Sequence, residues 1–308
     1  MEMQNHSRPL LEAENLTKRY EDGVLALDHV SFVVQPKQIY AMLGANGAGK
    51  TTTIKVLMNM LAASSGNATV LGVDSRRLSP REFAQIGYVS ENQDMPKRLT
   101  VGQYLNYLRP FYSTWDRILE ADILKQLRLP LDRKIGALSH GMRLKMSLAC
   151  ALPFKPRLLV LDEPFSGLDP LVRDEFMEGL IAQAGEMTVL ISSHELAEIE
   201  GVVTHVAFMD QGRLLFQESM DDLIARHREV RVTMDQVNAS IDTPPEWLEV
   251  RVFGNVLSFV DTRFDEASFG SRIDAQLKDV RHIDVQPLPL RAIFTTLARA
   301  AQDSGAQV

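Results

Sequence analysis

The chain has 308 residues, of which 45% are hydrophobic and 24% are charged, and its 33 basic and 40 acidic residues leave a net charge of −7. These values are typical of a globular protein with one large and one small domain or two ordinary domains, and they argue against a general affinity for nucleic acid or anionic lipid. The single cysteine excludes an internal disulfide bond and suits the cytosol, and no apolar run approaches the roughly 20 residues that cross a bilayer.

The first half of the chain predicts strands followed by helices. Residues 10–40 contain the strand-like runs LLEAENL, LDHVSFVV and IYAML, and the last of these leads into a glycine-rich loop. A helical pattern follows from Lys50 to about Leu61, and residues 100–151 carry many helical signals and few strand signals. We therefore predict a helical insertion over about residues 95–150.

The middle of the chain predicts a parallel sheet. LLVLDEP, residues 158–164, is an apolar run that ends in two acidic residues and a proline, which is typical of a buried parallel strand. Helical and strand-like runs then alternate in VRDEFMEGLIAQA, TVLISS, ELAEIE and VVTHVAFMD. This alternation predicts a doubly wound α/β core, in which the helical stretch is an insertion.

Near residue 228 the pattern changes. EVRVTM and WLEVRVFGNVLSFV alternate like strands with one exposed face, and Gly254 and Asn255 suit a hairpin turn. The amphipathic runs SRIDAQLKDV and LRAIFTTLARAA follow as helices. We predict two domains, an α/β domain over residues 1–228 and a small α+β domain over residues 229–308.

GANGAGKT, residues 44–51, matches the phosphate-binding pattern G-x-x-x-x-G-K-[ST] between a predicted strand and a predicted helix. Its glycines let successive N–H groups face a phosphate, and the helix N-terminus adds positive potential. In such a P-loop Lys50 bridges the β- and γ-phosphates and the Thr51 hydroxyl binds Mg²⁺. The residues predicted to contact the nucleotide here are Gly44, Ala45, Asn46, Gly47, Ala48, Gly49, Lys50, Thr51 and Thr52.

LLVLDE places two acids at the end of the predicted buried strand. Asp162 lies at the carboxyl end, where an open α/β sheet binds its ligand, so it would hold Mg²⁺ directly or through water. Glu163 beside it is the natural general base for an attacking water. A strand that merely ends in solvated acids is the alternative. Together, the P-loop and the two acidic residues predict a nucleoside triphosphatase, without indicating which kind.

Further motifs surround these two in a specific order. Tyr20 precedes the P-loop in LTKRYEDG, LSHGM (138–142) precedes LLVLDE, FSGLDP (165–170) follows it, and His194 follows the next strand in ISSHE. In this order the sequence resembles the nucleotide-binding subunits of ABC transporters over about residues 10–225. The resemblance implies the ABC-type fold, a P-loop core with an N-terminal antiparallel β-subdomain and a helical insertion.

The resemblance also implies a head-to-tail dimer with two ATPs between the subunits, the P-loop of one facing the signature turn of the other. Tyr20 would stack on adenine, although a tyrosine packed at a strand end is the alternative. His194 would contact the γ-phosphate and help to orient the water and Glu163. Ser166 and Asp169 would lie at the dimer interface.

The signature turn LSHGM departs from the commonest form, L-S-G-G-Q. His140 replaces the first Gly and Met142 replaces the Gln, while Ser139 and Gly141 remain. The resemblance implies that Ser139 and Gly141, with the N–H groups of a helix N-terminus, bind the ATP of the partner in trans. Ser139 also suits an ordinary helix N-cap. S-x-G-M followed by the basic Arg143 resembles a variant of bacterial export-type members.

A second departure follows IGYVS, where the family normally carries a Gln that touches Mg²⁺ or its water. Glu91 takes that place here, and Gln93 is the alternative. A carboxylate still accepts hydrogen bonds from Mg²⁺-bound water, but it adds negative charge and cannot donate as an amide does.

We therefore expect a subunit that binds and hydrolyses ATP with Mg²⁺ and powers a separate multi-helix membrane permease, as a homodimer or a heterodimer. LPLRAIFTTLARA resembles the ending of ATPases of ABC-2-type bacterial exporters, which favours export. The expected location is the cytoplasmic face of the membrane through the permease, with no nucleic acid partner. The alternatives are a soluble ABC-type ATPase of the ribosome or DNA and a regulatory ATP-binding module that does not hydrolyse.

Overall fold

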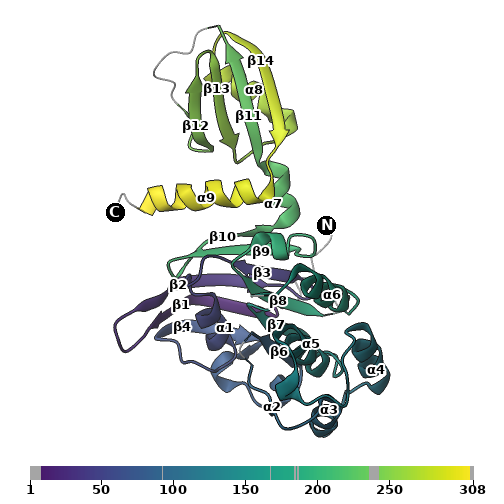
Figure 1. The fold of residues 1–308 in the computed structure, drawn as a ribbon. Coiled ribbons are helices and arrows are strands. Elements are labelled where there is room, and N and C mark those ends of the chain that lie inside the picture. The colour runs from purple at the N-terminus through teal and green to yellow at the C-terminus, as the bar shows by residue number, and fades with distance from the viewer. Residues whose placement is uncertain are drawn as a thin grey trace, which may run out of the picture. The chain divides into compact units, whose positions relative to one another are not determined.

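The computed structural model describes residues 8–91, 93–166, 168–183, 185, 187–235 and 243–305. The chain divides into two compact units, residues 1–217 and residues 218–308 (Figure 1). The division differs from the boundary predicted after residue 228 by the helix α7 (Met220–Arg226), which it assigns to the second unit.

The first unit begins with an antiparallel sheet of strand order β2-β1-β4-β5. Buried apolar side chains such as Leu11, Leu27 and Val30 join Ile54 and Leu57 in one hydrophobic core, which explains why the strands alternate buried and exposed residues. This sheet is the predicted N-terminal antiparallel subdomain. Its strands are β1 (Leu11–Arg19), β2 (Leu25–Val34), β4 (Ser65–Val70) and β5 (Val73–Asp74).

A six-stranded sheet of order β10-β9-β3-β8-β7-β6 forms the centre of this unit. Strand β8 pairs in parallel with β3 on one side and with β7 on the other, and every residue of β7 is buried. The predicted parallel α/β core is therefore confirmed. Its strands are β3 (Ile39–Leu43), β6 (Ile86–Ser90), β7 (Leu158–Asp162), β8 (Thr188–Ser193), β9 (His205–Asp210) and β10 (Arg213–Ser219).

Helix α1 (Lys50–Leu57) follows the P-loop and ends before the predicted Leu61, because Asn59 adopts a left-handed conformation with φ 55°. The predicted helical insertion contains α3, α4 and α5, which lie together on the side of the unit away from β1 and β2 (Figure 1). Besides α1, the described part of the unit contains α2 (Pro80–Phe83), α3 (Val101–Leu108), α4 (Arg117–Gln126), α5 (His140–Ala151), α6 (Pro170–Ile181) and the 3₁₀ turns Ser75–Arg77, Arg109–Phe111, Ile135–Ala137 and Leu196–Glu198.

The second unit has the predicted α+β fold, with α8 behind a four-stranded sheet of order β12-β13-β11-β14 (Figure 1). Val230 and Val232 of the sheet pack with Phe269 and Ile273 of α8. Phe253 pairs with Val256, so residues 254 and 255 form the predicted two-residue hairpin turn. The elements are β11 (Arg228–Met234), β12 (Trp247–Phe253), β13 (Val256–Asp261), α8 (Glu266–Gln276), β14 (Val280–Pro287) and α9 (Leu290–Gly305).

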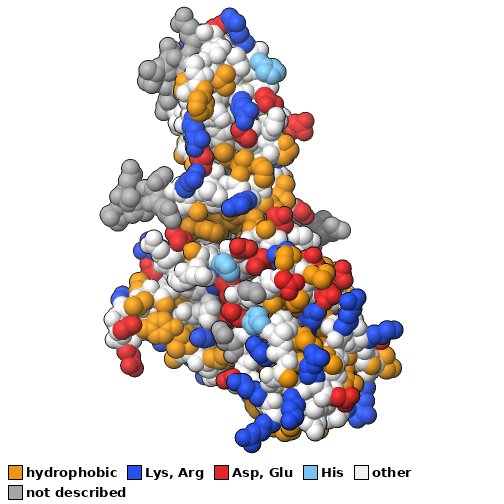
Figure 2. Space-filling view, viewed as in Figure 1, with side chains coloured by type: hydrophobic (Ala, Val, Ile, Leu, Met, Phe, Trp, Pro, Cys, Tyr) orange, Lys and Arg blue, Asp and Glu red, His pale blue; other side chains and the backbone are white. Residues whose placement is uncertain are grey.

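Within the described part of the chain, no helix has both the length and the apolar composition that crossing a bilayer requires. Although the net charge is −7, Lys and Arg side chains gather over the helical subdomain (Figure 2). The exposed basic residues there are Lys97, Arg98, Arg117, Lys125, Arg128, Arg133, Lys134 and Arg143.

The buried His227 makes the stability of the second unit depend on pH. It is fully buried between α7 and β11, its Nδ1–H donates to the carbonyl of Leu223 at 2.7 Å, and its Nε2 has no hydrogen-bond partner among the described residues. Burial lowers the pKa of His227 below the ordinary 6.5. Near pH 6.5, His227 therefore binds a proton in the unfolded chain but stays neutral in the folded unit. The free energy of unfolding consequently falls as the pH drops below that value.

We predict that His227→Gln flattens this pH dependence between about pH 5 and pH 7. The measurement is urea unfolding followed by the fluorescence of Trp247 in a Trp115→Phe background, in which Trp247 is the only tryptophan. His282→Gln, which alters an exposed histidine of the same unit, is the matched control and should keep the slope of the parent protein. Equal slopes in the parent and His227→Gln would contradict the assignment.

Candidate active site

The P-loop connects β3 to α1, and its shape depends on glycine. Gly44 has φ 154°, and a Cβ there would lie 2.2 Å from the carbonyl oxygen of Met209. Gly49 has φ 106° at the N-cap of α1, and a Cβ there would lie 2.8 Å from the carbonyl oxygen of Ala26. A side chain at either position would push the loop away from the sheet, so the loop curls only with glycine at both.

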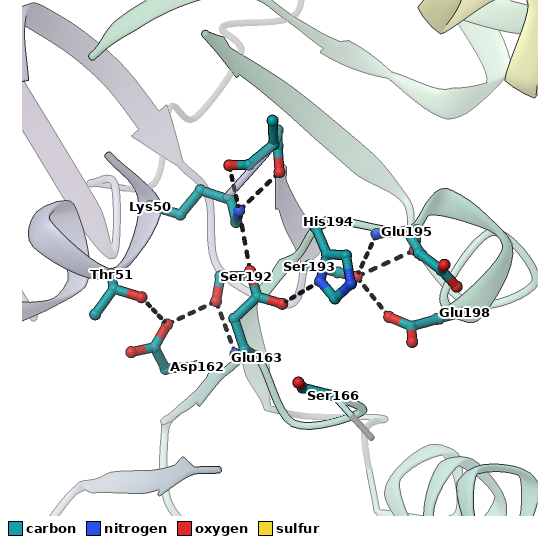
Figure 3. Close-up of polar contacts among 12 residues, drawn as sticks. Lys50, Thr51, Asp162, Glu163, Ser166, Ser192, Ser193, His194, Glu195 and Glu198 are labelled. Carbon is teal, nitrogen blue, oxygen red and sulfur yellow. Dashed lines mark hydrogen bonds and ion pairs between the residues drawn. The ribbon is translucent and has the colours of Figure 1, made fainter. Parts of the chain in front are cut away.

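Lys50 is 4% exposed at the first position of α1. Its ammonium group donates to the carbonyls of Gly44 at 2.7 Å and Ala45 at 3.1 Å, and it lies 3.0 Å from Oε1 of Glu163 (Figure 3). Folding thus holds a positive charge inside the P-loop and in contact with the first acid after β7. A buried cation at a helix N-terminus is suited to bind the phosphates of a nucleotide.

Asp162, the last residue of β7, is 6% exposed and accepts two hydroxyl hydrogen bonds on one oxygen, Oδ1. Thr51 donates from 2.9 Å and Ser192 from 2.7 Å (Figure 3). The predicted metal ligands Thr51 and Asp162 therefore do lie together. Their oxygen atoms are the hard ligands that Mg²⁺ prefers.

Among the described residues no three His, Cys, Asp or Glu side chains gather as a metal cage. Mg²⁺ is usually held by one or two carboxylates and the phosphates of the substrate, and the side-chain oxygens of Thr51 and Asp162 fit an ion bound in that way.

Glu163 follows β7 in a left-handed backbone conformation, with φ 49°. Its Oε2 accepts a hydrogen bond from Nδ1 of His194 at 2.9 Å, while Oε1 contacts Lys50 (Figure 3). The hydrogen bond from His194 to Glu163 raises the pKa of His194 above 6.5. Of the three residues predicted as catalytic, Lys50 and His194 thus each contact Glu163.

A cavity of about 160 Å³ opens between the P-loop and Glu163. The hydroxyl of Tyr20 lies 3.4 Å from Oγ1 of Thr52, so the predicted adenine-stacking residue adjoins this cavity, and its side chain is 36% exposed. The cavity is lined by Ala26, Asn46, Gly47, Gly49, Lys50, Thr51, Thr52 and Glu163. Of these, Ala26 was not foreseen, since β2 carries no nucleotide-binding pattern.

The two alternatives for the family's glutamine both lie just beyond β6. The N–H of Glu91 donates to the carbonyl of Asp162 at 3.4 Å, which places its backbone beside the acid that is predicted to bind the metal. The Oε1 atom of Gln93 is buried and without a hydrogen-bond partner in the described part of the chain. An unpaired buried amide oxygen is costly unless a ligand or water satisfies it, which favours Gln93. The assignment to Glu91 or Gln93 stays a prediction.

The signature turn begins α5. Ser139 is the N-cap and accepts from the N–H of Met142 at 3.3 Å, as predicted for its structural role. A Cβ on Gly141 would lie 2.8 Å from Cγ1 of Val172, so the glycine lets α6 pack against the start of α5. Neither Ser139 nor Gly141 is among the residues that line the cavity of the same chain.

His140 has a role that the sequence did not indicate. Its Nε2–H donates to the carbonyl of Ser166 at 3.2 Å, which joins the signature turn to the loop after Glu163. Asp169 ends that loop as the N-cap of α6, where it accepts from the N–H of Val172 at 3.1 Å, and Pro170 is the first residue of the helix.

Comparison with known proteins identifies the family. The family described as ABC transporter matches residues 27–166. The chain is 32% identical over 223 residues to the "Bacitracin transport ATP-binding protein BcrA" of Bacillus licheniformis, and the alignment covers 71% of this chain and 72% of that protein. The chain belongs to the ABC transporter family as an ATP-binding protein.

This ABC protein is also 33% identical over 223 residues to the "Probable multidrug ABC transporter ATP-binding protein YbhF" of Escherichia coli (strain K12). That alignment covers 70% of the chain but only 38% of the length of YbhF. Among solved structures, one described as "Structure of ATP binding subunit of ABC transporter" is similar with a TM-score of 0.63 and 28% identity, over 70% of this chain and 92% of that one. The predicted family and fold are thereby confirmed.

The raised pKa of His194 gives a direct test of the contact with Glu163. We predict that His194 titrates above 6.5 in the intact protein and that Glu163→Gln returns its pKa toward that value, because the neutral amide stabilises the imidazolium less than the carboxylate does. NMR titration of the histidine ring protons measures both values, with the exposed His282 as an internal reference. An identical His194 titration in the two proteins would show that the contact does not form in solution.

Proposed function

We propose that this ABC protein hydrolyses ATP to drive a separate membrane permease, and that it does so as a dimer. The observation that carries the proposal is the single polar network in which Lys50, Glu163 and His194 meet at the carboxyl ends of adjacent parallel strands. Parallel strands bring these residues together from distant parts of the sequence, and their types match what phosphoryl transfer to water requires.

The geometry supports a hydrolytic role for each side chain. Lys50 binds the phosphates of ATP, and Glu163 accepts a proton from the water that attacks the γ-phosphorus, while the bond to the leaving oxygen of ADP breaks. His194 holds the Glu163 carboxylate through Nδ1, and its raised pKa favours the imidazolium, whose Nε2–H can donate to the γ-phosphate. When bound by Thr51 and Asp162, Mg²⁺ would neutralise phosphate charge.

The size of the cavity supports a site built from two chains. Pockets that enclose a small molecule usually measure about 300–1,000 Å³, whereas the cavity at the P-loop measures about 160 Å³. Ser139 and Gly141 lie outside it at the start of α5, where the N-terminal N–H groups of a helix suit a phosphate. We infer that these two residues contact the ATP of a partner subunit, in a homodimer or a heterodimer.

Glu163→Gln is expected to lower ATP turnover by about 10²- to 10⁴-fold, because an amide of the same shape cannot accept the proton. ATP binding should persist, so size-exclusion chromatography with Mg-ATP should show a stable dimer. Lys50→Ala is the matched control, which should neither bind ATP nor dimerise. Unchanged turnover of Glu163→Gln would exclude Glu163 as the base.

The permease contact is proposed for the helical subdomain. Tyr107 and Phe111 are 59% and 63% exposed, and their ring centroids lie 5.3 Å apart. Neighbouring exposed aromatic rings are frequent in protein interfaces, and the exposed basic side chains of the same subdomain suit the anionic cytoplasmic surface of a membrane. ABC ATP-binding subunits work with membrane permeases, and the names of the multidrug and bacitracin relatives favour export. Neither the acidic net charge nor any motif favours a nucleic acid partner.

We predict that Tyr107→Ser combined with Phe111→Ser abolishes co-purification with a multi-helix protein from native membranes in mild detergent, because the aromatic contact is lost. The ATPase activity of the purified variant should stay close to that of the parent. Ile118→Ser, at an apolar side chain on α4 that is 77% exposed, is the control and should co-purify normally. Equal recovery in all three proteins would place the contact elsewhere.

A further inference from the structure

Ser192 is a polar residue in the apolar centre of the sheet. It follows the buried Leu190 and Ile191 in β8, is itself 0% exposed, and lies between β3 and β7. In the parallel register it is the residue opposite Asp162. A hydroxyl buried at such a position is unfavourable unless its donor and its acceptor are both satisfied.

Both capacities of the Ser192 hydroxyl are used, and both partners belong to the proposed site. Its oxygen accepts the main-chain N–H of Glu163 at 2.9 Å, and the oxygen lies 2.7 Å from Oδ1 of Asp162 (Figure 3). Because the ionised carboxylate only accepts, the single hydroxyl hydrogen must point to Asp162. The side chain therefore fixes the carboxylate of one acid and the backbone of the next.

The contact to Glu163 occurs where the ladder between β7 and β8 ends. Asp162 is the last paired residue of β7, and Glu163 turns into the left-handed region at φ 49°, which is unfavourable for a residue that has a Cβ. At the start of this turn, the N–H of Glu163 bonds to the side chain of Ser192 in β8. The same conformation directs the carboxylate of Glu163 to Lys50 and His194.

We propose that Ser192 is a positioning residue for hydrolysis, which holds Glu163 in the backbone conformation that aims its carboxylate and joins it to Asp162 and Thr51. The inference rests on the proposed function, since it assigns to Glu163 the part of general base. Ser192 acts through Glu163 and does not itself touch the substrate. Its loss therefore affects the chemical step and leaves the P-loop, with Lys50, able to bind ATP.

Two variants separate the hydrogen bonds of Ser192 from its volume. Ser192→Ala removes both bonds, and Ser192→Cys fills the same space with a thiol that donates and accepts weakly. In both we expect kcat to fall by about 10- to 100-fold, which is part of the contribution of an oriented general base, while the KM for Mg-ATP changes by less than about threefold. Full activity of Ser192→Cys, or a loss that lies in KM alone, would overturn the proposal.

Ser193→Ala is the matched control. Ser193 is the next residue of β8 and is 1% exposed, but its hydroxyl contacts Oε2 of Glu198 at 2.6 Å and the N–H of Glu195 at 3.0 Å. The variant removes the same atom one position away without touching Asp162 or Glu163. We expect it to retain a kcat close to that of the parent, and a loss equal to that of Ser192→Ala would overturn the proposal.

A double-mutant test distinguishes a failure of this inference from a failure of the proposed function. If Ser192 acts through Glu163, adding Ser192→Ala to Glu163→Gln should cause little further loss of turnover. A further loss as large as that in the parent background would show that Ser192 acts independently of Glu163. Unchanged turnover of Glu163→Gln alone would instead reject the proposed base, whatever Ser192 does.

Discussion

The parallel pairing of β8 with β3 and β7 is the constraint on which the site depends. Leu43 lies opposite Ser193, and Asp162 lies opposite Ser192, so three strands end at the same level. A different functional group follows each strand. The P-loop follows β3, Asp162 and Glu163 lie at the end of β7, and His194 follows β8. Because a one-residue slip would turn each side chain to the opposite face of the sheet, the apolar packing that fixes this register also fixes the chemistry.

Within that frame, hydroxyl groups connect the parts of the site. Thr51 and Ser192 meet on one oxygen of Asp162, so the start of α1, the end of β7 and the end of β8 share one acceptor. A buried carboxylate with two donors loses less on leaving water than a bare one. The network depends most on Ser192, since its displacement would take a hydrogen-bond partner from both Asp162 and Glu163.

The sequence predicted the P-loop, Asp162 and Glu163 from their spacing and His194 from the family resemblance, and the structure brings these residues together. The sequence was insufficient for Ser192, because SSH does not say which serine faces the neighbouring strand, and pairing is a property of distant segments. The contact of His140 with Ser166 and the packing of Gly141 against Val172 could not be predicted either, because both join segments that are distant in the sequence. The extent of α1 was overestimated, because a left-handed asparagine leaves the apolar pattern unchanged.

Gly141 has a packing role that is independent of its place in the signature motif. A Cβ there would lie 2.8 Å from Cγ1 of Val172, so any side chain would require Val172 or α6 to shift, irrespective of any ligand. A descendant of this protein that had lost the ability to bind ATP would still be under selection to keep the glycine for the sake of its fold. Glycine at this position therefore also records packing, and its presence alone does not show that the signature turn binds ATP.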